Sequence, residues 1–253
     1  MVDKKRWYSL FFLICVAIIL NSFPLDLFFK NAILNFSIGI ALKIAAIIFI
    51  FYYSKKESFT IPTFAKPNKK HLLFIPFLIA PFSNFFVVIL CNSTPIIDIN
   101  YQSIVFSFVN CALISIIEEM LFRCILLPEF EKVTTPFKAI LYTSLIFGGM
   151  HLLNISSLSS IPICLVQSIY TFGLGLVLGL IYIYGKNIIY PIIYHLLFNF
   201  LNNTLVTGLF NLEWNITFYL TNIFIAIILI IYGIYVYYIL SKEAIHATKN
   251  MDF

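Results

Sequence analysis

Long apolar segments, joined by short connections rich in lysine, are the feature that most constrains this chain. A helix of about 17–25 apolar residues crosses the hydrocarbon core of a bilayer. We predict about eight such spans in the 253-residue chain, at Trp7–Phe23, Leu34–Tyr53, Leu72–Cys91, Tyr101–Leu127, Phe137–Leu153, Ile161–Tyr184, Ile188–Val206 and Ile216–Leu240. Only 11% of the residues are charged, against roughly 25% in soluble domains. The sequence therefore predicts an all-α polytopic membrane protein with one transmembrane domain over residues 1–253.

The placement of the basic residues predicts an orientation. With the N-terminus inside, thirteen of the sixteen Lys and Arg fall in cytoplasmic segments, and Lys30 alone falls in an outer connection. Cytoplasmic loops carry such an excess of positive charge. We therefore expect a multi-pass protein of the cell membrane with both termini in the cytoplasm. The net charge of +5 then reflects contact with lipid headgroups, and it gives no reason to expect a nucleic acid partner.

Few ionisable residues remain at membrane depth, where each costs about 2.5–3.5 kcal/mol and therefore suggests a function. They are Lys43, Glu118, Glu119, Arg123, His151 and His195. Glu119 and Arg123 are four residues apart, a spacing that places them on one helix face in the favourable order. We expect this pair to act as a buried brace, with a structural role.

Glu118 is turned about 100° from its neighbour on the same helix and has no cation at helical spacing. Its candidate partners lie on later spans: His151, His195 and Asn199, of which the last two share a helix face. Counting about 1.5 Å per residue from the cytoplasmic ends places all four side chains roughly 12–20 Å deep. The sequence therefore predicts one polar cavity inside the membrane.

Three motifs follow one another along these spans: EEMLFR (118–123), FGGMH (147–151) and HLLFN (195–199). Their order and spacing, EExxxR, FxxxH and HxxxN, resemble the CAAX protease and bacteriocin-processing family of intramembrane proteases, also called the Abi family. The resemblance covers about residues 101–206. It implies an eight-helix membrane bundle with a polar cavity and an endopeptidase activity.

The resemblance also implies roles for the motif residues. Glu118 and His151 would activate the attacking water, His195 and Asn199 would stabilise the oxyanion, and Glu119 and Arg123 would support the site. A carboxylate aided by imidazole can deprotonate water, and amide and imidazole N–H groups can stabilise developing negative charge. No Ser or Cys has an aligned base, which favours attack by water over a covalent intermediate.

A metal is not favoured, although zinc is the alternative. Glu118, His151 and His195 would then be its three ligands, the usual number in a catalytic zinc site, but the HExxH motif is absent. The expected partners are a peptide or lipidated-protein substrate and membrane lipid, with a bacteriocin or pheromone peptide among the candidates.

Two other functions remain open from the sequence. A protein of the same fold could act without catalysis, in bacteriocin self-immunity or as a regulatory scaffold. A secondary transporter could use Glu118 and the histidines as a proton relay, but the broken helices and inverted repeat of that class are not evident. The glycine run GLGLVLG (173–179) is better explained by close helix packing.

Overall fold

The computed structural model of the chain describes residues 4–23, 25, 28, 30–60, 62–66, 69–155, 157–213 and 215–249. The described residues form helices and contain no β-strand. The α-helices are α1 Lys4–Asn21, α2 Ala32–Lys56, α3 Ser83–Leu90, α4 Tyr101–Glu119, α5 Leu127–Glu131, α6 Pro136–Met150, α7 Ile161–Gly185, α8 Ile189–Leu197, α9 Val206–Leu209 and α10 Ile216–Lys249. The prediction of an all-α membrane protein is confirmed.

Tighter and wider helical turns complete the elements. The 3₁₀ segments are η2 Lys69–Phe82, η4 His151–Asn154 and η5 Leu158–Ser160, and the π-helical segments are η3 Met120–Leu126 and η6 Phe198–Leu205. In η2, Pro76 and Pro81 lie inside the helix, and a proline there removes a regular hydrogen bond. The two π segments were not predicted from the sequence.

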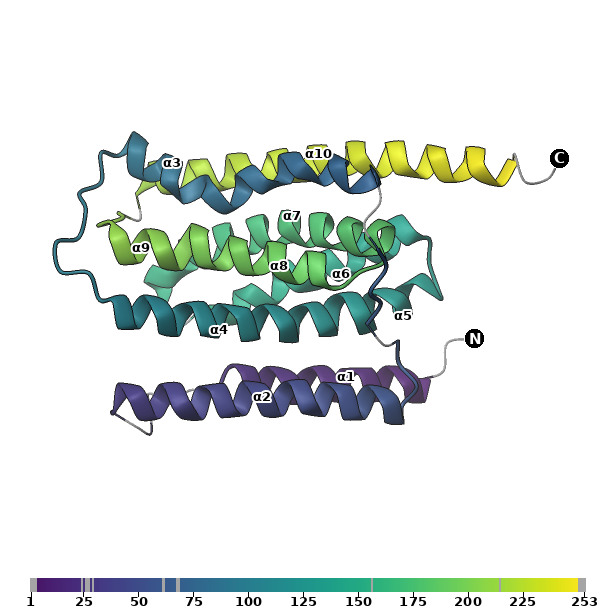
Figure 1. Ribbon diagram of the computed structural model, residues 1–253, viewed down its shortest axis with the longest axis horizontal. Helices are drawn as coiled ribbons and strands as arrows, with labels where there is room; N and C mark the ends of the chain where they lie inside the picture. The colour runs from purple at the N-terminus through teal and green to yellow at the C-terminus, as the bar shows by residue number, and fades with distance from the viewer. Residues whose placement is uncertain are drawn as a thin grey trace.

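The helices form layers along one common direction (Figure 1). The hairpin of α1 and α2 packs beside α4, and α10 packs on α3 and α7. Between these outer layers lie α4, α6, α7 and α8. The start of α1 and the end of α10 lie at the same end of the bundle (Figure 1), as expected for an even number of spans.

Each of the eight predicted spans contains helix, but they differ in length. Five helical stretches of the described chain are long and apolar enough to cross a membrane: Ala32–Lys56, Leu72–Leu90, Tyr101–Glu131, Leu158–Gly185 and Ile216–Lys242. Of the other three, α1 begins with three cations, KKR, and α6 is only 15 residues long. The third, α8, is followed by the polar π segment FNFLNNTL.

Local sequence signals explain where α2 and α6 begin. Asn31 caps α2 by accepting hydrogen bonds from the backbone N–H groups of Ile33 and Leu34, each at 3.0 Å. The Thr135 hydroxyl caps α6, and Pro136 occupies the first turn, where its missing N–H costs nothing. Such caps satisfy donors that a helix end leaves free.

Glycine allows α6 and α7 to approach closely, which places His151 beside the centre of the bundle. A Cβ atom added at Gly148 would lie 2.7 Å from the Ser168 carbonyl oxygen, and one at Gly175 would lie 3.0 Å from Ser144. The first distance is shorter than real Cβ atoms show, and the second would require Ser144 to shift. The close packing predicted for GLGLVLG is therefore present, whereas Gly149 has no such neighbour.

Candidate active site

The central acidic pair lies where α4 changes into the π-helical segment η3. Glu119 is the last residue of α4, and Arg123 lies one turn later in η3. The two side chains are 0% and 3% exposed, and Arg123 Nε lies 3.1 Å from Glu119 Oε2. The ion pair predicted from the i,i+4 spacing is therefore present. A π-helical turn inside an α-helix is rare and is often found at functional sites.

Other contacts fix the guanidinium group of Arg123. It donates to the Gly175 carbonyl oxygen at 3.4 Å, and its central carbon lies 4.8 Å from the centroid of the Phe147 ring. A cation over an aromatic face is stabilised by the ring electrons. The brace thus ties η3 to both α6 and α7.

His195, on α8, joins the two adjacent carboxylates. Its Nδ1 lies 2.8 Å from Glu119 Oε1, and its Nε2 lies 3.6 Å from Glu118 Oε2. An ionised carboxylate can only accept a hydrogen bond. Nδ1 therefore carries a hydrogen and donates the hydrogen bond to Glu119. In the neutral ring, the lone pair of Nε2 then faces Glu118.

This arrangement adds a contact to those expected from the sequence. Glu119 was expected to pair with Arg123 and to support the site, and the histidines were named as candidate partners of Glu118. The structure places His195 between the two carboxylates, with one ring nitrogen toward each. Both can be reached because the two nitrogens lie on different sides of the ring, while the carboxylates diverge from one helix.

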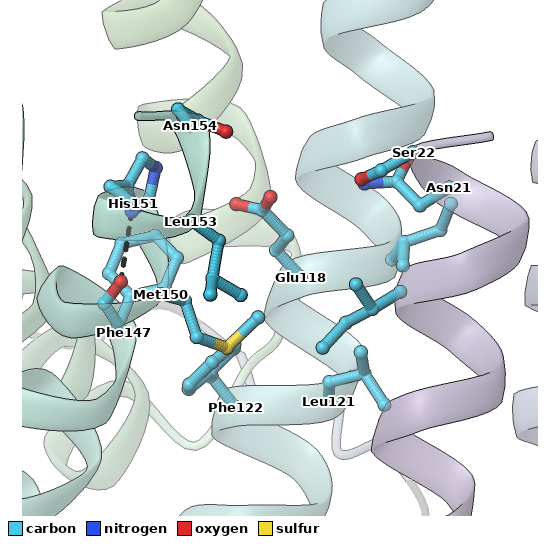
Figure 2. Close-up of a pocket in the computed structure, with 12 residues that line it drawn as sticks. Asn21, Ser22, Glu118, Leu121, Phe122, Phe147, Met150, His151, Leu153 and Asn154 are labelled. Carbon is cyan, nitrogen blue, oxygen red and sulfur yellow. Dashed lines mark hydrogen bonds between the residues drawn. The ribbon is translucent and has the colours of Figure 1, made fainter. Parts of the chain in front are cut away.

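Glu118 differs from its neighbour in its access to open space. Its side chain is 21% exposed, and it lines a cavity of about 310 Å³. The cavity is bounded by Ile18, Asn21, Ser22, Ile117, Glu118, Leu121, Phe122, Phe147, Met150, His151, Leu153 and Asn154. Figure 2 shows the Glu118 carboxylate pointing toward the wall that carries His151 and Asn154.

His151 lies at the end of α6, as the first residue of η4. Its Nδ1 lies 2.9 Å from the Phe147 carbonyl oxygen, which can only accept, so Nδ1 donates (Figure 2). The lone pair of the neutral ring is then on Nε2. His151 therefore lines the cavity with a nitrogen that can accept a proton.

Asn199 is placed differently from the other predicted residues. It lies in the π-helical segment η6, one turn after His195, and is half-buried. Among the described residues, those that line the cavity do not include it. The structure thus brings together Glu118, Glu119, Arg123 and His195 in one chain of contacts and places His151 on the wall of the cavity that Glu118 borders. Asn199 is not among the residues that line this cavity.

Sequence reasoning gave no role to Phe147, the first residue of the FxxxH motif. Its buried ring makes edge contacts with both His151 and His195, with centroids 5.3 Å and 5.7 Å away. It therefore fixes the positions of two imidazoles and of Arg123. The motif spacing carried this signal, because residues four apart in a helix share a face.

Asn21 and Ser22 were also missed. They lie at the end of α1 and form the wall of the cavity opposite His151 (Figure 2). Neither stands in a motif, and only tertiary packing brings α1 to this place.

Comparison with known proteins gives one family match. Residues 100–201 match a family model described as Type II CAAX prenyl endopeptidase Rce1-like. This segment is therefore similar to that family. It carries every predicted site residue from Glu118 to Asn199, whereas α1 lies outside it. Among curated proteins, no sequence matches the chain.

Proposed function

We propose that the chain is an intramembrane endopeptidase that hydrolyses a peptide bond with a water molecule activated by Glu118. One observation supports the proposal. The Glu118 carboxylate is partly exposed and borders a cavity, and a series of buried contacts leads from it through His195 and Glu119 to Arg123. A positioned carboxylate with an imidazole behind it is suited to proton transfer.

The first step adds water to the scissile carbonyl. Glu118 accepts a proton from the water as the water oxygen bonds to the carbonyl carbon, and an electron pair moves onto the carbonyl oxygen. His195 Nε2 lies 3.6 Å from Glu118 Oε2, so it can take up that proton after a small approach. Glu119 keeps the ring in the required orientation through Nδ1.

The second step breaks the C–N bond. The oxyanion is stabilised by N–H donors, for which the protonated His195 and the Asn199 amide are the candidates. The bond electrons leave with the nitrogen, which recovers a proton from Glu118 or His195. One water is consumed, and the products are an acid and an amine. Arg123 compensates the charge of Glu119.

Zinc fits this donor set only in part. Glu118 Oε2 and His195 Nε2 are 3.6 Å apart, and Glu119 supports His195 as an outer carboxylate would. However, no group of three or more His, Cys, Asp and Glu side chains in the described residues is arranged to hold a metal ion. Catalytic zinc needs three protein ligands, so the described residues do not fit a catalytic zinc ion.

The test uses purified protein in lipid nanodiscs and a mixture of synthetic peptides, half of them with a lipidated C-terminal cysteine. Cleavage is read by mass spectrometry. We expect the wild-type chain to cut a subset of the peptides, and Glu118→Gln to lower the rate about 10²–10⁴-fold. The matched control is Glu213→Gln, in an exposed loop, which should cut at the wild-type rate. Unchanged cleavage by Glu118→Gln would refute the proposal.

Chelation addresses the metal separately. Because the mechanism uses only side chains, we expect exhaustive dialysis against a chelator to leave the cleavage rate unchanged. Loss of activity that returns on adding zinc would show that the active enzyme binds zinc with a complete set of ligands.

A further inference from the structure

The cavity beside Glu118 has one closed end and one open end. Its closed end is built from apolar side chains that are each only 1–2% exposed: Ile117, Leu121, Phe122 and Phe147. At the other end lie Ser22, Leu153 and Asn154, all of them exposed, with Leu153 at 75%. Figure 2 shows the Glu118 carboxylate turned away from Leu121 and Phe122 and toward the end near Asn154.

The open end carries a neutral polar rim formed by Asn21, Ser22 and Asn154. Asn21 Oδ1 is buried and has no hydrogen-bond partner among the described residues, although an unpaired buried acceptor costs about 1–3 kcal/mol. Its amide faces the cavity across from Glu118 (Figure 2). Such a rim suits water or the N–H groups of an extended peptide.

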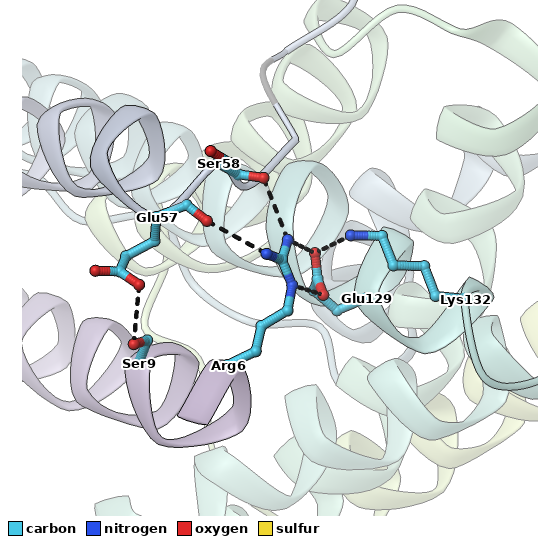
Figure 3. Close-up of polar contacts among 6 residues, drawn as sticks. All are labelled: Arg6, Ser9, Glu57, Ser58, Glu129 and Lys132. Carbon is cyan, nitrogen blue, oxygen red and sulfur yellow. Dashed lines mark hydrogen bonds and ion pairs between the residues drawn. The ribbon is translucent and has the colours of Figure 1, made fainter. Parts of the chain in front are cut away.

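The opposite end of α1 is closed by an ionic cluster (Figure 3). Arg6 contacts both carboxylate oxygens of Glu129 at 2.5 Å, and Lys132 contacts one of them at 2.6 Å. Arg6 also donates to the carbonyl oxygens of Glu57 and Ser58, at 3.3 and 3.2 Å. These contacts join α1, α5 and the end of α2.

The two ends are well separated along the bundle. Arg6 and Asn21 are fifteen residues apart on one helix, a distance of about 22 Å. The end with the ionic cluster is also rich in lysine. Lys55 and Lys56 precede Glu57 in the sequence, and Lys132 follows Glu129. Positive residues collect on the cytoplasmic side, so the orientation expected from the sequence places the polar rim on the other side of the membrane.

We propose that the substrate reaches Glu118 from the extracytoplasmic side, across the rim of Asn21, Ser22 and Asn154. The substrate class is then a peptide segment exposed on the outer face of the membrane that enters the cavity in extended form. The cleavage itself rests on the proposed function above, but the direction of access does not.

Cysteine accessibility tests the direction without any substrate. Cys15 and Cys91 are replaced by serine, while the buried Cys111, Cys124 and Cys164 are kept. Single cysteines are then introduced as Ser22→Cys at the rim, Glu118→Cys in the cavity and Lys132→Cys at the basic end. Sealed right-side-out vesicles are treated with a membrane-impermeant sulfonated maleimide, before and after permeabilisation.

We expect Ser22→Cys and Glu118→Cys to react in sealed vesicles, and Lys132→Cys to react only after permeabilisation. Reaction of Glu118→Cys from the same side as Lys132→Cys, or from neither side, would overturn the proposal. If Glu118→Cys fails to fold, Met150→Cys reports on the same cavity and is read in the same way. A chain that labels as expected but cuts no peptide would lose the protease assignment and keep its direction of access.

Discussion

Glu118 and Glu129 are two carboxylates in the same run of helical turns, and their surroundings differ sharply. Glu129 is 5% exposed and is held by Arg6 and Lys132 at 2.5–2.6 Å. Glu118 is 21% exposed, borders a cavity, and has Nε2 of His195 3.6 Å from its Oε2. A carboxylate whose two oxygens are both paired with cations, as in Glu129, has a structural role. A carboxylate with an open face and one titratable partner is available to bind water and accept its proton.

Glu119 lies between these two cases, and its replacement should have the largest effect on stability. Glu119→Gln removes the charge that compensates the buried Arg123. Breaking a buried pair on one side costs about 3–5 kcal/mol, so we expect a large fall in the thermal unfolding temperature in nanodiscs. Glu118→Gln is the matched control and should unfold near the wild-type temperature. Equal unfolding temperatures for both variants would show that Glu119 contributes no more to stability than Glu118 does.

Glu129→Gln tests the structural role of the second carboxylate in this comparison. The variant keeps the size of the side chain but weakens charge-assisted hydrogen bonds from Arg6 and Lys132. Such bonds contribute about 1.5–3 kcal/mol each when well formed, and partial exposure of Arg6 reduces that value. We expect a loss of about 1–2 kcal/mol in unfolding free energy, with cleavage per folded molecule within twofold of wild type. A Glu129→Gln protein that folds normally but no longer cleaves would place Glu129 in the chemistry.

Asn21→Leu should have the smallest effect, and its sign is informative. Leucine removes an unpaired buried acceptor, so stability should stay the same or rise slightly. If Asn21 bonds an entering peptide, losing about 0.5–1.5 kcal/mol should raise KM roughly 2- to 10-fold and leave kcat within twofold. Steady-state kinetics on the best-cleaved library peptide separates the two constants. A fall in kcat with unchanged KM would mean that the rim acts on the chemistry and not on binding.

The class of protein and the local brace could be predicted from sequence because both depend on short-range spacing. Apolar segments of sufficient length predict membrane helices, and an i,i+4 pair on one helix meets whatever surrounds it. The order of EEMLFR, FGGMH and HLLFN likewise indicated the family that residues 100–201 match. Each of these signals is contained in one helix or in the order of successive helices.

The parts that could not be predicted involve residues distant in the chain or changes in helical pitch. His195 meets Glu118 and Glu119 from 77 and 76 positions away, and no local periodicity states which ring nitrogen faces which carboxylate. The π-helical segments η3 and η6, which contain Arg123 and Asn199, also have no simple composition signal.

By itself, therefore, the sequence determined that this chain is a helical membrane protein with a braced acidic pair and candidate polar partners, because spacing along a helix fixes which side chains share a face. Only the tertiary structure decided that His195 joins both carboxylates, that Phe147 separates the two histidines, and that α1 supplies the rim of the cavity. Those relations depend on how helices pack at close range, and packing is set by the shapes of many side chains together.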